Sequence, residues 1–163
     1  MLRKEVNDML TQTDKGTPMG ELFRQYWIPA MLASELPEND CPPVRCELLG
    51  EKMIAFRDTE GRYGLLEEFC AHRRVSLWFA RNEECGLRCP YHGWKFDVTG
   101  QCVEIPSEPE DSEFRKEVKL QAYPLIKVGD ILWTHMGDPT NIPQEPEWEF
   151  ATDAPEQTVS TTR

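Results

Sequence analysis

Phe69–Phe96 reads FCAHRRVSLWFARNEECGLRCPYHGWKF and combines two short pairs of cysteine and histidine. The pairs are Cys70-x-His72 and Cys89-x-x-His92, and sixteen residues separate them. The chain has only three histidines, so two of the three lie within three residues of a cysteine. Each pair follows a predicted strand, at a turn. Two such loops facing each other would present two thiolates and two imidazoles to a metal.

A mixed set of two thiolates and two imidazoles favours a binuclear centre with two unlike ends. In such a centre two thiolates hold one iron and two neutral imidazoles hold the other. Replacing two cysteines by two histidines removes two negative charges from the ligand set. This raises the reduction potential well above that of an all-cysteine cluster. Because imidazoles titrate near neutral pH, the potential of such a centre can also depend on pH.

Two other interpretations of these four residues stay open. Tetrahedral zinc is commonly bound by two cysteines and two histidines, although zinc sites usually pair like with like, as Cys-x₂₋₄-Cys or His-x₃₋₅-His. The four residues could also be ordinary buried or surface side chains that bind no metal. The remaining cysteines and the third histidine are expected to have no metal role; they are Cys41, Cys46, Cys85, Cys102 and His135.

Short strands separated by turn residues predict an all-β sandwich or barrel for the central part of the chain. Gly61, Gly100 and Gly129 each lie in a predicted turn between two such strands. Several short strands at regular spacing are typical of these architectures. The predicted strands are Val44–Leu49, Met53–Phe56, Tyr63–Phe69, Trp94–Val98, Gln101–Ile105, Val118–Val128 and Ile131–Met136.

The two ends of the chain differ in composition from this central region. We expect residues 1–37 to be helical and irregular, with Thr17 capping a short helix over Met19–Tyr26. Pro29 is expected to break regular structure. Residues 138–163 are proline-rich and acidic, which predicts a linker or extended tail leading towards further protein.

The composition makes two kinds of partner improbable. The chain has 163 residues, is 39% apolar and contains no run of 18 apolar residues, so no membrane span is expected. Lys and Arg number 18 against 29 Asp and Glu, which gives a net charge of −11. A nucleic-acid binder needs the opposite charge balance. With no apolar leader segment after Met1, we expect a cytoplasmic location.

The pattern in Phe69–Phe96 resembles that of Rieske [2Fe–2S] domains. A single Cys-x-His pair would carry little information. Two pairs in this order, with Cys-Pro-Tyr-His-Gly-Trp-x-Phe in the second, are much more specific. The resemblance implies a Rieske-type antiparallel β-sandwich over residues 38–137, with a small cluster-binding subdomain at about 68–109.

The resemblance also implies a role for each ligand of a [2Fe–2S] cluster. Cys70 and Cys89 would bind the inner iron. His72 and His92 would bind the outer iron, each through one ring nitrogen. Four further residues are expected to surround the cluster, where they would shape the loops and contact a partner; they are Arg73, Tyr91, Gly93 and Trp94.

The branch of the Rieske family can be inferred from three positions. Respiratory Rieske proteins have two further cysteines that form a disulfide, where this chain has Val75 and Tyr91. They also have a serine that donates a hydrogen bond to the cluster, where this chain has Trp94. Fewer donors stabilise the reduced cluster less, which lowers its potential. The resemblance is therefore to the low-potential Rieske domains that supply oxygenases.

Within that branch, Gly20–Pro29, Arg81–Cys89 and Tyr91–Cys102 resemble the N-terminal part of phthalate 4,5-dioxygenase and phenoxybenzoate dioxygenase type subunits. The resemblance implies a flavin-containing reductase as electron donor and a mononuclear iron domain as acceptor, in a homotrimer of the full-length subunit. A mononuclear iron of this kind is bound by two histidines and a carboxylate, and His135 is the one histidine not expected to bind the cluster, so this chain cannot supply that site. We therefore expect the chain to transfer electrons without catalysing alone. A stand-alone Rieske ferredoxin and a zinc-stabilised binding module are the alternatives.

Overall fold

The β2–β3 hairpin shows how the local sequence sets the geometry of this protein. β2 (Val44–Leu48) and β3 (Glu51–Arg57) pair in antiparallel register across the two-residue turn Leu49-Gly50. Both turn residues have positive φ, 47° and 78°. This backbone twist matches that of the flanking strands, so a two-residue turn of this kind closes a tight hairpin. The computed structural model describes residues 2–109, 112–145 and 147–148.

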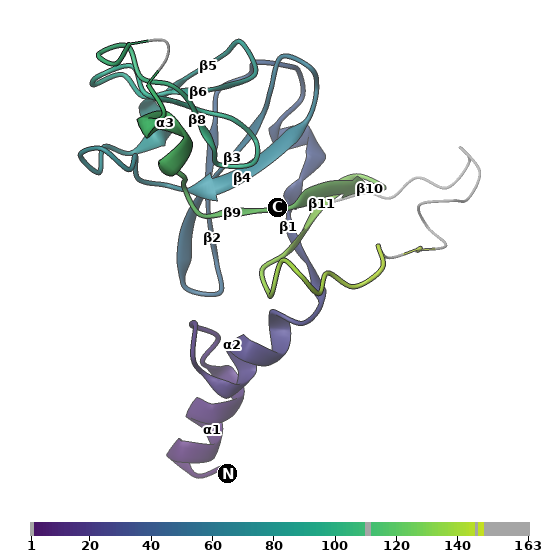
Figure 1. Ribbon diagram of the computed structural model, residues 1–163. Coiled ribbons are helices and arrows are strands. Elements are labelled where there is room, and N and C mark those ends of the chain that lie inside the picture. The colour runs from purple at the N-terminus through teal and green to yellow at the C-terminus, as the bar shows by residue number, and fades with distance from the viewer. Residues whose placement is uncertain (1, 110–111, 146, 149–163) are drawn as a thin grey trace, which may run out of the picture.

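The described residues form three antiparallel sheets with a few short helices (Figure 1). One sheet has the strand order β1-β11-β10, the second β2-β3-β4-β9 and the third β5-β6-β7-β8. The other strands are β1 (Trp27–Leu32), β4 (Tyr63–Glu67), β5 (Arg81–Glu83), β6 (Gly86–Arg88), β7 (Lys95–Phe96), β8 (Cys102–Glu104), β9 (Ala122–Tyr123), β10 (Leu125–Val128) and β11 (Ile131–His135). The helices are α1 (Lys4–Thr11), α2 (Pro18–Phe23), α3 (Phe114–Glu117) and the 3₁₀ turns η1 (Ala33–Glu35) and η2 (Leu77–Phe79).

The second sheet separates two hydrophobic cores. Successive residues of β3 point to opposite faces, so Ile54 and Phe56 pack in one core while Met53 and Ala55 pack in the other. The first of these cores also contains Cys70 and one residue from each of three strands of the third sheet, Leu87 of β6, Phe96 of β7 and Cys102 of β8. Packing on both faces of a central sheet confirms the predicted all-β, Rieske-type sandwich with a smaller sheet at one end.

The N-terminal helices are anchored to the sheets through one buried cation. Thr17 caps α2, because its hydroxyl accepts a hydrogen bond from the Gly20 backbone N–H at 3.2 Å. Just after α2, Arg24 forms a 2.7 Å ion pair with Glu51 and donates to the Leu49 carbonyl. The helices project from one end of the sheets in Figure 1, and no residue of α1 is buried.

Several expected element boundaries were wrong. Pro29 lies inside a strand, β1, because β1 is an edge strand with a register shift between Pro29 and Met31, where a missing N–H is tolerated. The helix expected over Met19–Tyr26 ends at Phe23. The strand expected over Val118–Val128 is divided into β9 and β10 by Pro124. No helix of the described part of the chain is long and apolar enough to cross a bilayer.

The segment after Gly137 begins by folding back over the first sheet. The Trp27 indole N–H donates to the Pro143 carbonyl at 3.0 Å, and the Trp148 ring lies 5.6 Å from that of Trp133. Most of the stretch expected to be a linker, residues 149–163, lies outside the described residues. The division of the chain at residues 37 and 137 stays a prediction.

Candidate metal centre

Two loops bring the four predicted ligands together beside the third sheet. The first loop, residues 70–75, follows β4, and the second loop, residues 89–94, joins β6 to β7. Cys70 and Cys89 are almost fully buried, with 1% and 3% of their surface exposed. His72 and His92 are exposed on the outside of the same loops. The thiols therefore face the core and the imidazoles face the surface.

The two loops share one backbone hydrogen-bond pattern. In the first loop the Cys70 N–H donates to the Val75 carbonyl and the Arg74 N–H donates to the Cys70 carbonyl, both at 2.9 Å. In the second loop the Cys89 N–H donates to the Trp94 carbonyl at 2.9 Å. The Gly93 N–H donates to the Cys89 carbonyl at 3.0 Å. Each cysteine thus begins a closed turn that holds it at the edge of the core.

The fifth residue of each loop has a left-handed backbone. Its φ is +56° at Arg74 and +75° at Gly93. Glycine adopts this region without strain, whereas a residue with a side chain does so at a cost. A Cβ at Gly93 would also lie 2.9 Å from the Pro106 Cγ, so the second loop requires glycine for two reasons.

The imidazoles form one group of rings at the surface. The His72 and His92 ring centroids are 4.6 Å apart. Trp94 stacks on His72 at 4.6 Å with only 6° between the planes, so a residue of the second loop orients the histidine of the first. The Tyr91 ring lies 3.9 Å from the His92 ring on the exposed side. These contacts limit how far either imidazole can rotate.

The thiol of Cys70 has a strongly perturbed pKa. Burial raises this pKa to about 11, and the adjacent Cys89 thiol adds to the increase. The backbone N–H groups of His72 and Arg73 point towards the sulfur and act in the opposite direction. The site therefore keeps a proton on the sulfur until a metal ion displaces it.

The pKa of the His72 imidazole is lowered. Partial desolvation is the largest cause, followed by repulsion from His92 and Arg73. Lowering this pKa favours the neutral ring, the form in which histidine binds a metal.

The donor set fits a cluster with two unlike ends. The thiols form one buried pair and the imidazoles form one exposed pair, which are the donors required by a two-iron centre with a Cys₂ end and a His₂ end. Among residues 2–109, 112–145 and 147–148, no three Cys, His, Asp or Glu side chains are grouped to hold a single metal ion. Ligands of a binuclear cluster need no such common point, because two sulfides lie between the irons.

The structure also places the other residues that the sequence singled out. Tyr91 is 56% exposed and Trp94 is buried at 8%. The Arg73 side chain is exposed and makes no hydrogen bond or ion pair within the described residues. All six cysteines are free thiols. His135 is buried in β11 with its ring 6.0 Å from that of Trp27, on the sheet opposite the loops.

Sequence reasoning missed a group of charges beneath the second loop. Arg88, Lys95 and Glu104 lie on three neighbouring strands and interact with one another. In the sequence, the only indication of this group is that Arg88 and Lys95 lie directly before and after the second loop. Glu104, which bridges them, is on β8, and its position beside them follows from the strand register.

The chain belongs to the Rieske [2Fe–2S] domain family, whose model matches residues 26–124. It is therefore an electron-transfer domain that carries a Rieske-type [2Fe–2S] cluster. It is 46% identical over 150 residues to the phthalate 4,5-dioxygenase oxygenase subunit of Pseudomonas putida, covering 91% of this chain and 34% of that one.

Two further relatives place the chain in the same group. It is 38% identical over 147 residues to the phenoxybenzoate dioxygenase subunit alpha of Ectopseudomonas oleovorans, covering 90% of this chain and 35% of that one. The crystal structure of dicamba monooxygenase superposes with a TM-score of 0.69 at 26% identity, over 80% of this chain and 40% of that chain. This chain spans about a third of the length of the two dioxygenase subunits.

Proposed function

We propose that Cys70 and Cys89 bind the inner iron of the cluster and that His72 and His92 bind the outer iron. One observation supports this assignment above the others: the thiols are paired and buried, whereas the imidazoles are paired and exposed. When bound, the cluster takes up one electron and passes it on. The imidazole edge is the side from which an electron reaches a partner, because it is the exposed side.

The residues around the loops have separate tasks in this proposal. Trp94 holds the His72 ring in one orientation by stacking on it. Gly93 allows the second loop to turn close to the cluster and to Pro106. Tyr91 and the unpaired cation Arg73 present an exposed aromatic ring and a positive charge to a docking protein.

The electron donor is a flavin-containing reductase and the acceptor is a mononuclear iron domain of an aromatic-ring oxygenase. This part of the proposal is supported by relatives that are named as oxygenase subunits. A mononuclear iron bound by two histidines and a carboxylate needs histidines that this chain does not have, since only His135 remains. Oxidation of an aromatic substrate would therefore take place on protein beyond these 163 residues.

The proposal extends to the organisation of the full-length protein. Residues 1–37 would form an N-terminal segment, residues 38–137 the Rieske domain and residues 138–163 the connection to the catalytic domain. The full-length subunit would assemble as a homotrimer, in which the cluster of one subunit serves a neighbour. Six cysteines without a disulfide fit a reducing compartment, and we place the protein in the cytoplasm.

Electron uptake tests the proposal directly. The purified chain would be mixed with NADH and a flavin-containing, NADH-dependent reductase under argon, while the visible absorbance of the cluster is followed. We expect bleaching in the wild-type chain and none in Cys89→Ser, which lacks one inner ligand. Cys85→Ser is the matched control, because Cys85 is a free thiol in the β5–β6 turn, and it should bleach like the wild type. A Cys89→Ser variant that bleaches normally would refute the ligand assignment.

A further inference from the structure

A row of charged side chains runs across the third sheet at the base of the second loop. Arg88 of β6 is the cross-strand partner of Lys95 of β7, and Lys95 is in turn the partner of Glu104 of β8. Arg88 and Lys95 are the residues directly before and after the loop 89–94. Two like charges directly opposite each other destabilise a sheet unless an acid bridges them.

Glu104 and Glu84 both bridge the two cations. Glu104 accepts two hydrogen bonds from the Arg88 guanidinium, at 2.7 and 2.8 Å, and lies 3.2 Å from the Lys95 ammonium. Glu84 lies 3.1 Å from Arg88 and 3.0 Å from Lys95. Glu83 accepts from the Arg88 Nε at 2.6 Å. The planar guanidinium is thus fixed by acids on two of its edges.

One donor of this fixed guanidinium points at the second loop. The Arg88 Nη1 donates to the Gly93 carbonyl at 3.2 Å, and Gly93 is the residue after His92. The Gly93 N–H is held at the same time by the Cys89 carbonyl. Both backbone groups of Gly93 are therefore restrained. The Arg88 side chain is only 12% exposed, so water competes weakly for this hydrogen bond.

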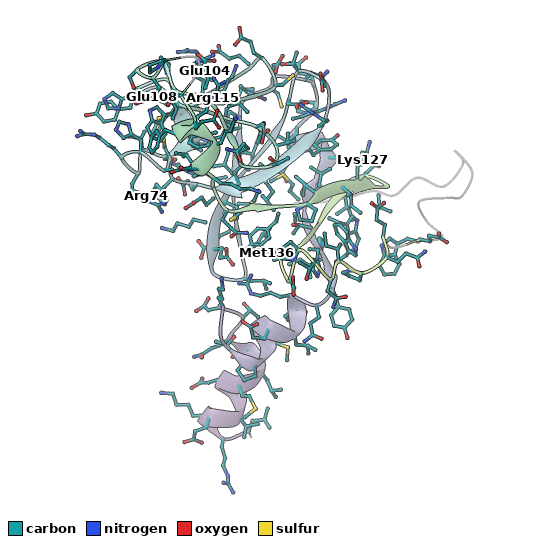
Figure 2. The ribbon with its side chains drawn as sticks, viewed as in Figure 1. Arg74, Glu104, Glu108, Arg115, Lys127 and Met136 are labelled. Carbon is teal, nitrogen blue, oxygen red and sulfur yellow. The ribbon has the colours of Figure 1, made fainter. Side chains whose placement is uncertain are left out.

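We propose that Arg88 is a positioning residue, which fixes the loop that carries His92 through the Gly93 carbonyl, and that Glu104 aims its guanidinium. The inference rests on the proposed role of His92 as a cluster ligand. Among the residues that the structure describes, no buried cation donates to a carbonyl of the first loop. Its two arginines, Arg73 and Arg74, are both exposed, and Arg74 lies well apart from Glu104 in Figure 2. The two loops can therefore be perturbed separately.

Arg88→Lys tests the proposal, because it keeps the positive charge but cannot form the two-pronged pairing that aims a donor at Gly93. Hydrogen exchange of the cluster-loaded protein would be measured by mass spectrometry on peptides covering residues 89–94 and 70–75. We expect exchange about tenfold faster at 89–94, where a charge-assisted hydrogen bond is lost, and unchanged exchange at 70–75. Iron loss to a chelator should also be about tenfold faster, and the EPR lines of the reduced protein should broaden.

Arg81→Lys is the matched control. Arg81 is the cross-strand partner of Arg88 and also pairs with Glu83, but it is exposed and donates to no loop carbonyl. It should match the wild type in all three measurements. If Arg88→Lys is not recovered as a folded protein, Glu104→Gln provides the same comparison, because it removes the acid that aims the guanidinium.

Three outcomes of the Arg88→Lys comparison decide between the proposal and its alternatives. Faster exchange confined to 89–94 supports the proposal. Wild-type exchange at 89–94 overturns it, since only the charge at residue 88 would then matter. Equally faster exchange in both loops also overturns it, because the role would be general stability of the sheet. A wild-type chain without iron would refute the proposed function instead, before any variant is compared.

Discussion

Cys70 and His72 are two residues apart and yet lie in different surroundings. The thiol is packed in the core that contains Phe56 and Phe96, whereas the imidazole is at the surface. The difference arises from the closed turn that begins at Cys70, which directs the first residue inwards and the third outwards. At the scale of the residue, the proposed centre is therefore asymmetric in charge and in exposure to water.

This asymmetry predicts the effect of exchanging one ligand type for the other. His72→Cys should retain a cluster, because a thiolate is a stronger iron ligand than an imidazole. Its reduction potential should fall by on the order of 100 mV, about half of the roughly 250 mV that separates low-potential Cys₂His₂ clusters from Cys₄ clusters, because the added negative charge disfavours reduction. Potentiometric titration followed by EPR measures the shift. His92→Ala supplies no replacement ligand and should lose its iron, so an iron content equal to that of the wild type would show that His92 is not a ligand.

The sequence could predict the residue types of the centre but not their neighbours. Two cysteine–histidine pairs at turns were enough to single out the four proposed ligands. The stacking of Trp94 on the ring of the opposite loop depends on how two loops face each other. No local pattern encodes that arrangement. For the same reason the role proposed for Arg88, which lies next to a proposed ligand in the sequence, depends on the register of β6, β7 and β8 and could not be predicted from the sequence.

At the scale of the element, short strands with turn glycines were predicted better than strands with prolines. The hairpin of β3 and β4 was expected and is observed, with Phe56 opposite Gly64. β1 was missed because Pro29 suggested a break, although an edge strand tolerates proline. β5 and β6 were missed because the turn between them, Glu84-Cys85, contains no glycine or proline, whereas Gly100 marks the turn between the similarly short β7 and β8.

The second loop gives a prediction at this scale. Gly93→Ala would place a Cβ at φ +75° and 2.9 Å from the Pro106 Cγ. We expect a loss of about 2 kcal/mol or more in the free energy of unfolding, and a lower iron content. Urea unfolding and iron analysis measure the two effects.

Gly16→Ala is the matched control for this substitution. Gly16 has a similar φ of +86°, but a Cβ there would meet nothing within 4 Å. It should cost about 1 kcal/mol and leave the iron content unchanged. Equal losses of stability in the two variants, with wild-type iron content in both, would contradict the prediction that the second loop needs glycine because it lies close to Pro106.

At the scale of the whole molecule, the acids of the third sheet couple stability to pH. Hydrogen bonds from Arg88, and to a smaller extent from Lys95, lower the pKa of Glu104 to about 2, well below its usual value. A carboxylate whose pKa is lower in the folded state than in the unfolded chain stabilises the folded state above the unfolded pKa. That contribution is lost as the pH falls from about 5 towards 2.

Glu104→Gln should therefore flatten the acid side of the stability profile. We expect the melting temperature of the wild type to fall more steeply than that of the variant below about pH 5. The two proteins would be compared by differential scanning calorimetry at equal iron content. Glu113→Gln controls for the loss of one negative charge, because Glu113 is exposed and, within the described part of the chain, forms an ion pair with Lys116 alone. Parallel profiles for wild type and Glu104→Gln would contradict the expectation.

The whole chain also shows where sequence reasoning stops. A net charge of −11 and the absence of long apolar runs argue against nucleic-acid and membrane partners. They do not indicate the path that an electron would take. The packing of the three sheets determines which loops meet, and each hydrophobic core lies between the second sheet and one of the other two. This packing depends on pairing between strands that are far apart in the sequence. The proposed partners rest on relatives about three times as long as this chain.

The central claim is that two cysteines and two histidines of this chain hold a [2Fe–2S] cluster. The most direct measurement is the iron, acid-labile sulfide and zinc content of anaerobically purified protein, together with an EPR spectrum after reduction with dithionite. The account predicts about two irons and two sulfides per chain, no zinc and a rhombic Rieske-type signal. About one zinc per chain, with no sulfide and no EPR signal, would contradict it and would indicate a structural metal site.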